Sequence, residues 1–424
     1  MKKNYQSVLF LGIGGVSMHQ LALAYREKGY TVYGYDKKLN EYSNLCSNAG
    51  IIVTNRFKKE FLHVDFCVKT AAIKDNNKYI VNLKKLNCPI FDRARILGKI
   101  CEEFKCVIAV AGTHGKSTTA SLIYEILRTV NKKVSCHIGA DVFAPRFKCG
   151  DDYLVVEACE YNKSFLHLKP TISVVTNVEA EHLDTYKNIF NLRTAFLTFL
   201  KRGLKRFVYD TNSVSYLKRV KNTTFVKRTN LKIKPKIKGE YNLDNISLAV
   251  AVCEFLGVDD STIVKAVNSF IGIPRRYEFL GLYNNKKIFI DYAHHPTELK
   301  AFIETFSQEF KECKIVFQPH TYSRTKMFLS EFISVLKEVD NLCIYKEYPA
   351  RERPSCGISA HELYMELKKY NNNIKYATSI KNVLNFIGKE RAIAFVGAGD
   401  IDSVAKKIIK SSSKNGWQMT IFKV

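Results

Sequence analysis

The chain has 424 residues, 46% of them hydrophobic and 25% charged, which excludes a disordered chain. Its length exceeds a single ordinary hydrophobic core, so two or three globular domains are expected. Lys and Arg outnumber Asp and Glu by 66 to 40, and the net charge of +26 favours anionic ligands without singling out one class.

An α/β unit is predicted at the start of the chain. Val8 to Ile13 reads as a buried strand, Met18 to Lys28 as a helix, and Thr31 to Tyr35 as a second strand. The loop GIGGVS before the helix resembles the dinucleotide fingerprint G-x-G-x-x-G, with Ser17 in place of the third glycine. Asp36 stands about where a ribose-binding acid is expected. A ligand is therefore predicted at the carboxyl ends of these strands.

A second glycine-rich loop follows the apolar run Cys106 to Val110, where residues 109–119 read AVAGTHGKSTT. Closely spaced glycines let backbone N–H groups converge on an anion, Lys116 adds a cation, and Ser117 can ligate Mg²⁺. The helix predicted from about Thr118 directs its positive end at the same place. A nucleoside triphosphate is the first ligand to expect.

The spacing within this loop departs from the ordinary P-loop. Gly112 is separated from Gly115 by two residues, whereas the ordinary pattern has four residues before its Gly-Lys pair. The contraction argues against ordinary GTPases and motor ATPases. For the motif taken alone, a strand-to-helix turn without a ligand is the alternative.

Polar residues follow the next two apolar runs, Tyr153 to Val156 and Thr171 to Val175. Glu157 comes after the first run, where a Walker-B-like acid completes a magnesium shell, and Thr176-Asn177 comes after the second. His182 stands a few residues later between acids. Taken singly, each is more readily a surface acid or a packed histidine. Their succession after a phosphate loop predicts a metal–nucleotide site.

The segment from Lys201 to Lys238 is unusually basic, with thirteen Lys or Arg and one acid. Its alternating part, Lys232 to Lys238, is predicted as an exposed edge strand whose lysines and proline discourage pairing with another chain. A solvated surface is favoured over a binding role. No zinc-finger, helix-turn-helix or RNP-like motif accompanies the charge, so no nucleic acid partner is expected.

A third α/β unit is predicted after Gly272. Apolar runs alternate there with helical segments such as Thr297 to Glu309. His294 and His295 precede that helix, and contacts at the helix start are favoured over metal ligation because no partner has metal spacing. Arg324, in QPHTYSRT, is a candidate fork for a carboxylate or phosphate. The apolar runs are Lys287 to Ile290, Lys314 to Phe317, Asn341 to Tyr345 and Ala392 to Val396.

Twelve cysteines are scattered along the chain without CxxC spacing. This usage indicates free thiols in a reducing compartment, not a disulfide framework or a zinc site. The apolar run from Val8 to Val16 is broken by three glycines, and no stretch has transmembrane length. The sequence predicts a cytoplasmic protein without membrane insertion.

The predicted architecture is three α/β domains. Residues 1–100 form a Rossmann-like domain, residues 101–272 a central P-loop-type ATPase with a parallel sheet, and residues 273–424 a C-terminal Rossmann-like domain.

Eight ordered motifs resemble those of the Mur ligases: GIGGVSM, AGTHGKSTT, EACEYNKSF, TNVEAEHLD, PRRYEFLG, DYAHHPTE, FQPHTYSRT and VGAGDI. The resemblance runs from about Val8 to Ile401. It implies a first domain for a UDP-sugar, a central one for ATP, and a last one completing the ATP and amino acid sites. In the implied Mg²⁺-dependent reaction, a muramyl carboxylate attacks the γ-phosphate of ATP, and an amine then displaces phosphate from the acyl phosphate.

Among Mur ligases, the chain is most similar to those that add L-alanine to UDP-N-acetylmuramate in peptidoglycan synthesis. A recycling ligase that attaches a ready-made murein tripeptide to the same sugar nucleotide is one alternative. A non-catalytic nucleotide-binding homologue is another. The sequence leaves open whether the protein is a monomer or a homodimer.

The resemblance also assigns nucleotide and metal contacts by motif position. Asn245 would meet the adenine, while Arg276 and Asp291 would reach the phosphate and ribose. The magnesium ligands would be Ser117, Glu157 and His182. The phosphate loop would hold ATP through Gly112, Thr113, His114, Gly115, Lys116, Ser117 and Thr118.

Substrate contacts are implied in the first and last domains. Tyr292, His294 and Arg324 would orient the amino acid and the acyl intermediate. The catalytic residues implied are Lys116, His182, His294 and Arg324. The UDP part would be received by Gly12, Gly14, Gly15 and Ser17.

Overall fold

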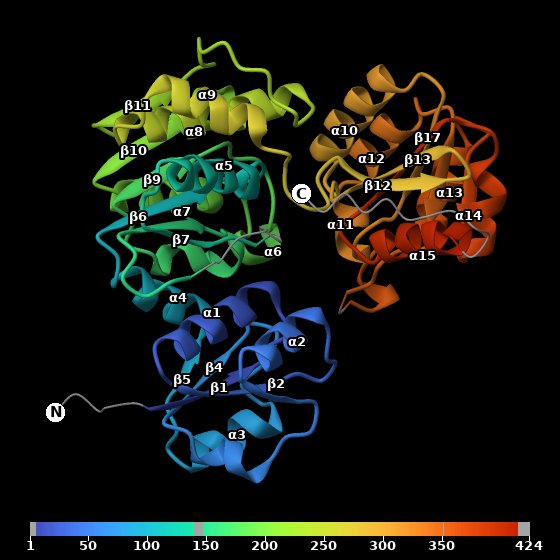
Figure 1. Ribbon diagram of the computed structural model, residues 1–424. Helices are drawn as coiled ribbons and strands as arrows, with labels where there is room; N and C mark the ends of the chain where they lie inside the picture. The colour runs from blue at the N-terminus through green and yellow to red at the C-terminus, as the bar shows by residue number, and fades with distance from the viewer. Residues whose placement is uncertain (1–5, 140–146, 351, 414–424) are drawn as a thin grey trace. The chain divides into compact units, whose positions relative to one another are not determined.

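A computed structural model gives the structure of the chain and describes residues 6–139, 147–350 and 352–413. Three sheets flanked by helices make up this part, which confirms the predicted α/β class with three domains (Figure 1). The chain divides into two compact units, residues 1–236 with 242–270, and residues 237–241 with 271–424. The first unit holds two of the sheets and the second holds one. The exact domain limits at residues 100 and 272 stay predictions.

The first sheet is parallel and has the strand order β3-β2-β1-β4-β5. Its middle strand β1 is buried on both faces, as an apolar run between two neighbours requires. Helices α1 and α4 pack on one face, and η1 and α3 pack on the other. The elements are β1 (Ser7–Leu11), α1 (Val16–Glu27), β2 (Thr31–Tyr35), α2 (Glu41–Asn48), β3 (Ile52–Thr54), η1 (Lys59–His63), β4 (Phe66–Lys69), α3 (Lys78–Lys85), β5 (Ile90–Asp92) and α4 (Arg93–Cys101).

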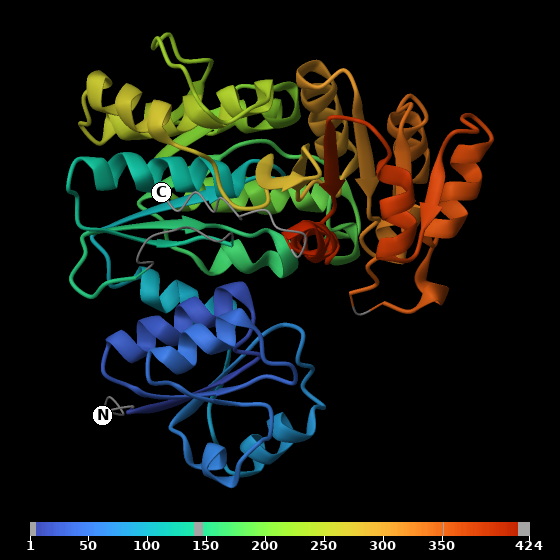
Figure 2. The ribbon, with the colours of Figure 1, turned by 45° about the vertical axis from the view of Figure 1, so that its right-hand side comes forward.

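The central sheet is also parallel, with the order β11-β10-β9-β6-β8-β7. Helix α7 and the 3₁₀ segment η2 pack on one face, and α5 lies on the other face beside α9 (Figure 2). Its elements are β6 (Cys106–Ala111), α5 (Lys116–Thr129), β7 (Val134–His137), β8 (Tyr153–Glu157), η2 (Tyr161–His167), β9 (Ile172–Val175), α6 (Leu183–Tyr186), α7 (Ile189–Arg202), β10 (Lys205–Tyr209), η3 (Asn212–Arg219), β11 (Thr223–Val226), α8 (Glu240–Phe255) and α9 (Asp260–Ser269).

The first and central sheets share one continuous hydrophobic core. Helix α4 packs so closely on η2 that a Cβ at Gly98 would lie 2.4 Å from the carbonyl oxygen of His167. The buried Gln20 of α1 donates to the carbonyl oxygen of Ile138 at 2.8 Å. These contacts explain why the two sheets form one compact unit.

The third sheet has the order β12-β13-β17-β14-β15-β16 and is parallel except for the β12–β13 pair. Helices α10, α12 and α13 cover one face, and α14 and α15 cover the other. Its elements are β12 (Glu278–Tyr283), β13 (Lys286–Asp291), α10 (Pro296–Glu309), β14 (Cys313–Phe317), α11 (Tyr322–Met327), α12 (Leu329–Leu336), β15 (Leu342–Tyr345), η4 (Pro354–Cys356), α13 (Ala360–Lys368), β16 (Lys375–Ala377), α14 (Ile380–Ile387), β17 (Ala392–Val396) and α15 (Ile401–Ser413).

The prediction of an edge strand from Lys232 to Lys238 is wrong. The backbone there forms no strand, and the edge of the central sheet is β11. Pro235 has no N–H for a strand ladder, and the N–H of Lys234 is bonded to the side chain of Asn268. The alternation nevertheless keeps its lysines exposed, as predicted.

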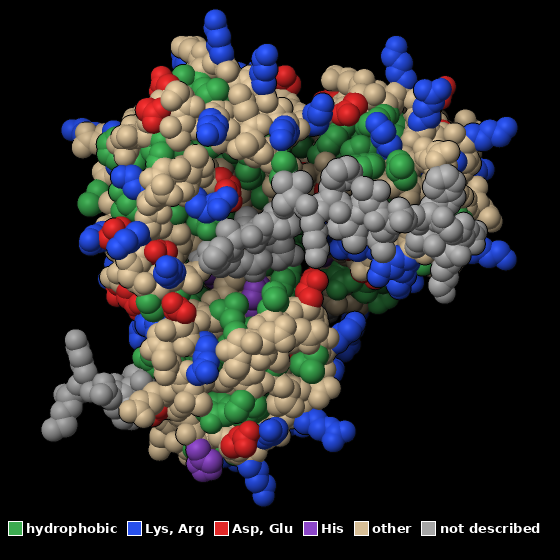
Figure 3. Space-filling model, viewed as in Figure 1, with side chains coloured by type: hydrophobic (Ala, Val, Ile, Leu, Met, Phe, Trp, Pro, Cys, Tyr) green, Lys and Arg blue, Asp and Glu red, His purple; other side chains and the backbone are tan. Residues whose placement is uncertain are grey.

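Lys and Arg side chains are spread over the visible face of the molecule, not gathered in a single patch (Figure 3). All twelve cysteines are free thiols, as their scatter predicts. Within residues 6–139, 147–350 and 352–413, no helix is both long and apolar enough to span a membrane.

Candidate functional site

The phosphate loop connects β6 to α5 at the carboxyl end of the central sheet. Gly115 has a φ of 82°, and a Cβ there would lie 2.1 Å from Oδ1 of Asn245. Gly112 has a φ of 149°, and its Cβ would lie 1.8 Å from Oγ1 of Thr176. Both positions therefore require glycine, for conformation and for space. Helix α5 begins at Lys116, two residues before the predicted start.

The end of the neighbouring strand β9 holds the loop in shape. The N–H of Thr113 donates to the carbonyl of Asn177 at 3.0 Å, and that of His114 donates to the Asn177 side chain at 2.9 Å. The hydroxyl of Thr176 donates to the His114 carbonyl at 2.6 Å. The loop is thus shaped by the residues that follow the next strand.

Lys116 lies folded over its own loop. Its Nζ donates to the carbonyl oxygens of Gly112 at 2.5 Å and Thr113 at 2.9 Å. It also lies 3.1 and 3.0 Å from the two carboxylate oxygens of Glu160. Burial by itself lowers the pKa of the Lys116 ammonium, but the surrounding carboxylates, Glu160 foremost, raise it above its ordinary value. Lys116 is therefore a firmly charged cation.

Ser117 and Glu157 meet beside the loop. The Ser117 hydroxyl donates to Oε2 of Glu157 at 2.8 Å, and the N–H of Gly139 donates to the same oxygen at 2.8 Å. Glu157 is the last residue of β8, which pairs directly with β6. Strand order therefore brings together two oxygen ligands that lie forty residues apart in the sequence.

His182 lies in a second acidic cluster. Its Nε2 is 3.6 Å from Oε1 of Glu160. Glu160, Glu181 and His182 each offer a ligand atom, and these atoms lie within 4.8 Å of one another. His182 has a φ of 54°, a left-handed conformation that a non-glycine residue adopts at an energetic cost. Such strain, kept where a histidine faces two acids, is typical of a functional position.

Asn245, predicted to meet adenine, lies on α8 against the phosphate loop. It is buried, its Oδ1 accepts from the Thr119 hydroxyl at 3.3 Å, and its Nδ2 donates to Asn242 at 3.1 Å. Thr118 is buried on α5. The structure therefore places Asn245 at the loop, while its contact with adenine stays a prediction.

In the first unit, two side chains from the segment between β2 and α2 close the turn Gly12–Gly15. The N–H of Gly14 donates to Oδ2 of Asp36 at 2.9 Å, and Asn40 donates to the Gly14 carbonyl at 2.9 Å. A carboxylate is a natural partner for sugar hydroxyl groups, so its place beside this turn agrees with the ribose-binding interpretation.

Ser17, at the start of α1, joins the first and central sheets. Its Oγ lies 2.7 Å from Nε2 of His137, at the end of β7, and accepts from Arg93 at 2.8 Å. The three side chains come from separate elements of the first unit, α1, β7 and α4. Neither Arg93 nor His137 stands in a motif that the sequence singled out.

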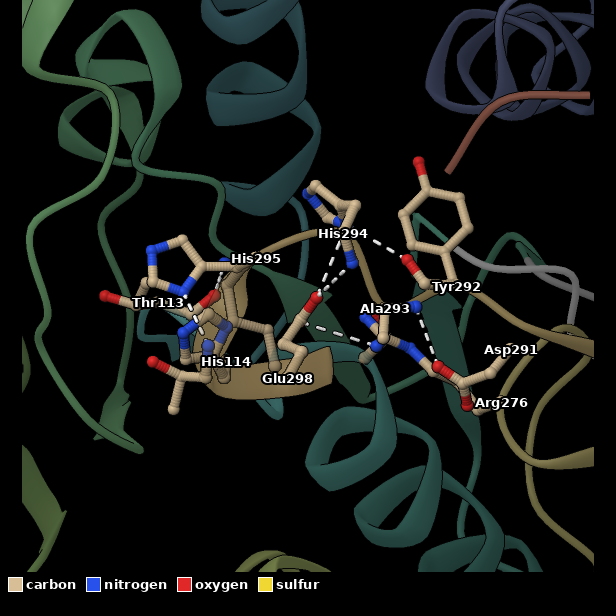
Figure 4. Close-up of polar contacts among 12 residues, drawn as sticks. Thr113, His114, Arg276, Asp291, Tyr292, Ala293, His294, His295 and Glu298 are labelled. Atoms are coloured by element: carbon tan, nitrogen blue, oxygen red, sulfur yellow. Dashed lines mark hydrogen bonds and ion pairs between the residues drawn. The ribbon is translucent and has the colours of Figure 1, made fainter. Parts of the chain in front are cut away.

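In the second unit, a polar cluster lies between the end of β13 and the start of α10 (Figure 4). The carboxylate of Asp291 accepts from the N–H groups of Tyr277 and Ala293, both at 2.7 Å. Burial raises the pKa of Asp291 to about 6, against the lowering effect of Arg276 and of these two donors. Burial thus outweighs the contacts that favour the charged form of this acid.

Glu298 on α10 connects two predicted site residues of this cluster (Figure 4). It lies 3.4 Å from Arg276 and 3.3 Å from Nδ1 of His294. Nδ1 of His294 also lies 3.0 Å from the Tyr292 carbonyl. His295 caps α10 by accepting from the N–H of Thr297, which confirms the predicted helix-start role.

Arg324 lies on α11, with its NH1 3.0 Å from Nδ1 of His320. Burial, with the charges of Arg324 and Arg275, lowers the pKa of His320 to about 4, so this imidazole is neutral near pH 7. The guanidinium of Arg275 lies 4.7 Å from the centre of the Tyr292 ring. Arg275 also lies 3.7 Å from Asp402, and Arg324 offers a planar fork suited to a carboxylate.

Three family models match the chain. The model described as Mur ligase family, catalytic domain, matches residues 7–105, the Mur ligase middle domain matches 110–209, and the Mur ligase, glutamate ligase domain, matches 275–401. These ranges cover more than half of the sequence. The chain belongs to the Mur ligase family.

Curated relatives of this Mur ligase are similar along nearly the whole chain. A UDP-N-acetylmuramate–L-alanine ligase of Caldicellulosiruptor bescii is 34% identical, covering 95% of this chain and 98% of the relative. The corresponding ligase of Acetivibrio thermocellus is also 34% identical, with 96% of each chain covered.

Solved structures share the fold of this Mur ligase. The UDP-N-acetylmuramate–alanine ligase of Thermotoga maritima has a TM-score of 0.83 at 23% identity, covering 96% of this chain and 99% of that one. A murein peptide ligase of Psychrobacter arcticus has a TM-score of 0.71 at 20% identity, covering 96% of this chain and 98% of that one.

The loop residues of this Mur ligase suit magnesium. The hydroxyl of Ser117 and the carboxylate of Glu157 are the hard oxygen ligands that Mg²⁺ prefers, and they already lie in contact. His182 supplies nitrogen, which Mg²⁺ favours less, but the neighbouring carboxylates of Glu160 and Glu181 supply oxygen. The donor set therefore fits the ion.

Sequence reasoning assigned no specific contact to several residues that build this Mur ligase's candidate site. Asn177 shapes the loop, Glu160 partners Lys116, and Arg93 and His137 meet Ser17. The sequence signal for Glu160 and Asn177 was their place just after buried strands. Arg93 and His137 had no such signal.

Proposed function

We propose that the chain is an ATP-dependent ligase that joins L-alanine to the carboxylate of UDP-N-acetylmuramate, releasing ADP and phosphate in peptidoglycan precursor synthesis. The curated relatives that carry this activity in their names support the proposal, because they match this chain from end to end. The family is ATP-dependent, and Mg²⁺ is the divalent ion we propose for it.

The observation that carries the proposal is the meeting of Lys116, Ser117 and Glu157 around a contracted glycine loop. A carboxylate nucleophile and a triphosphate repel each other, so a site that joins them must neutralise both and hold them in line. A firmly charged lysine beside hard oxygen ligands meets the phosphate half of this requirement.

Two loop residues, with three residues from neighbouring segments, have proposed parts in the first step. The muramyl carboxylate attacks the γ-phosphorus, the bond to the β–γ bridging oxygen breaks, and ADP leaves. Lys116 would hold the β- and γ-phosphates through its ammonium protons, and Ser117, Glu157 and His182 would hold magnesium ions, which would neutralise phosphate charge. Asn245 meets the adenine.

The second step uses the C-terminal cluster in this proposal. The neutral amine of alanine attacks the carbonyl carbon of the acyl phosphate, and the resulting tetrahedral intermediate loses one amine proton and expels phosphate, which takes up the proton, to leave the amide. Arg324, Tyr292 and His294 orient the amino acid and the acyl intermediate; the His294 ring contacts that of Tyr292, and Arg324 contacts His320. Because His320 is neutral near pH 7, its Nδ1 can accept a hydrogen bond from Arg324 and orient the guanidinium.

Localisation and assembly belong to the same proposal. The free thiols agree with a reducing compartment, and we propose that the protein acts in the cytoplasm. A monomer or a homodimer, without a nucleic acid partner, is the proposed assembly.

The test is amine-dependent phosphate release from purified protein, ATP, Mg²⁺ and UDP-N-acetylmuramate. Alanine should stimulate release, and omission of the sugar nucleotide should abolish it. Release with murein tripeptide but not with alanine would assign the recycling reaction instead. Absence of release with every amine would contradict a ligase.

A further inference from the structure

Glu160 is a buried acid that the proposed reaction uses neither to hold phosphate nor to orient a substrate. It follows β8 at the start of η2 and is 1% exposed. Its backbone carbonyl accepts from the Tyr186 hydroxyl at 2.5 Å, so its backbone is anchored independently of its carboxylate. The carboxylate itself points at Lys116 and His182.

The ammonium of Lys116 has no N–H to spare in this structure. A lysine ammonium has three donor protons. Its three partners are the carbonyls of Gly112 and Thr113 and the carboxylate of Glu160. A nucleotide phosphate can gain a hydrogen bond from Lys116 only by displacing one of these partners.

Glu160 is the partner that a phosphate can replace. The two carbonyls belong to the loop, whose shape is fixed by Asn177 and Thr176. Glu160 is instead a negatively charged side chain, and a phosphate offers the same charge and the same kind of acceptor oxygen. The two anions therefore compete for one cation.

Displacement leaves the Glu160 carboxylate buried without its lysine. An unpaired buried charge is costly, so the carboxylate requires another cation. His182 and Glu181 lie next to it, and with Glu160 they form a group of ligand atoms close enough for one ion. The exchange of partners thus couples phosphate binding to cation binding.

We propose that Glu160 is the resting counter-ion of Lys116, that nucleotide phosphates replace it, and that the displaced carboxylate makes tight nucleotide binding depend on a divalent cation. This inference rests on the proposed ATP site. It makes Glu160 a positioning residue, acting through Lys116, and not a group that touches the reacting atoms.

The test measures ADP affinity by calorimetry, with Mg²⁺ and with a chelator, in the absence of sugar nucleotide and amino acid. Glu160→Gln keeps the volume and removes the charge. It should bind metal-free ADP about tenfold more tightly than the unaltered chain, because a charge-assisted bond no longer competes for Lys116. The affinity gain on adding Mg²⁺ should shrink correspondingly. If the ratio of ADP affinity with Mg²⁺ to ADP affinity with chelator is the same in Glu160→Gln as in the unaltered chain, the proposal is overturned.

Two further variants complete the test. Glu125→Gln, on α5 and bonded to Arg128, makes the same substitution away from the loop and should leave both affinities unchanged. Glu160→Asp keeps the charge but shortens its reach, so it should raise metal-free affinity several-fold and keep most of the Mg²⁺ gain. If melting shows that Glu160→Gln is unfolded, an unchanged metal-free affinity in Glu160→Asp refutes the proposal. Because no alanine is present, this result is independent of the ligase assay.

Discussion

The phosphate loop and the C-terminal polar cluster both bury charged groups, but they treat them in opposite ways. At the loop, the Lys116 ammonium contacts a carboxylate directly, and its pKa is raised above its ordinary value. In the C-terminal cluster, burial and two arginines lower the pKa of His320, while burial raises the pKa of Asp291. A buried group keeps its charge where an opposite charge touches it, and loses it where burial or a like charge dominates.

The difference suits the tasks proposed for the two regions. A phosphate needs a permanent cation, and contact with Glu160 keeps the Lys116 ammonium charged before the ligand arrives. An amino acid carboxylate needs a well-oriented guanidinium, and the lowered pKa of His320 leaves its Nδ1 able to accept from Arg324. The variants below test whether the two regions differ in this way.

The largest effect is expected from Lys116→Ala. It removes the buried ammonium group. Alanine-dependent phosphate release should fall by roughly a thousandfold or more, because phosphoryl transfer depends on electrostatic stabilisation. Steady-state phosphate release measures the loss. Lys132→Ala removes an exposed lysine beyond the other end of α5 and should leave the rate unchanged. Equal rates of phosphate release in both variants would contradict a role for the loop in the reaction.

A smaller effect, on stability, is expected from Gly115→Ala. The alanine would adopt a left-handed conformation and overlap Asn245, at a combined cost of about 2–4 kcal/mol. Gly257→Ala is a matched control, because Gly257 has a similar φ of 78° but open space around it, and it should cost only about 1 kcal/mol. Denaturant unfolding compares the two. Equal losses would mean that the loop is not closely packed against α8.

The smallest effects are expected in the pH dependence of the C-terminal unit. His320 has a folded pKa of about 4, below its ordinary value of about 6.5, so the unfolded chain binds more protons between these limits. Stability should therefore fall as the pH falls through this range. His320→Asn should flatten the dependence of the melting temperature on pH, by a few degrees between pH 4 and 6.5.

Asp291 should act in the opposite sense. Its pKa of about 6 lies above the ordinary value of about 4, so the folded chain binds more protons between these limits and its stability falls as the pH rises. Asp291→Asn should therefore make the rise of melting temperature with pH steeper. Parallel melting curves for the unaltered chain and both variants would contradict the assigned shifts.

Local sequence patterns accounted for most of the fold. The runs that became β2 and β17 were predicted to the residue, and the predicted helix Thr297 to Glu309 differs from α10 by one residue, because strand and helix patterns act within a few residues. The alternation from Lys232 to Lys238 misled, since the same pattern suits an extended segment that pairs with no strand.

The sequence by itself determined that a glycine loop with Lys116 and Ser117 follows a buried strand and begins a helix. Glycine spacing, apolar runs and capping are local properties, so they can be read along the chain. Only the tertiary structure decided that Glu160 partners Lys116, that Asn177 shapes the loop, and that Arg93 and His137 meet at Ser17. These contacts depend on the sheet order β9-β6-β8 and on the packing of α4 against η2. Both bring together residues that are far apart in the sequence, so their closeness in space cannot be read along the chain.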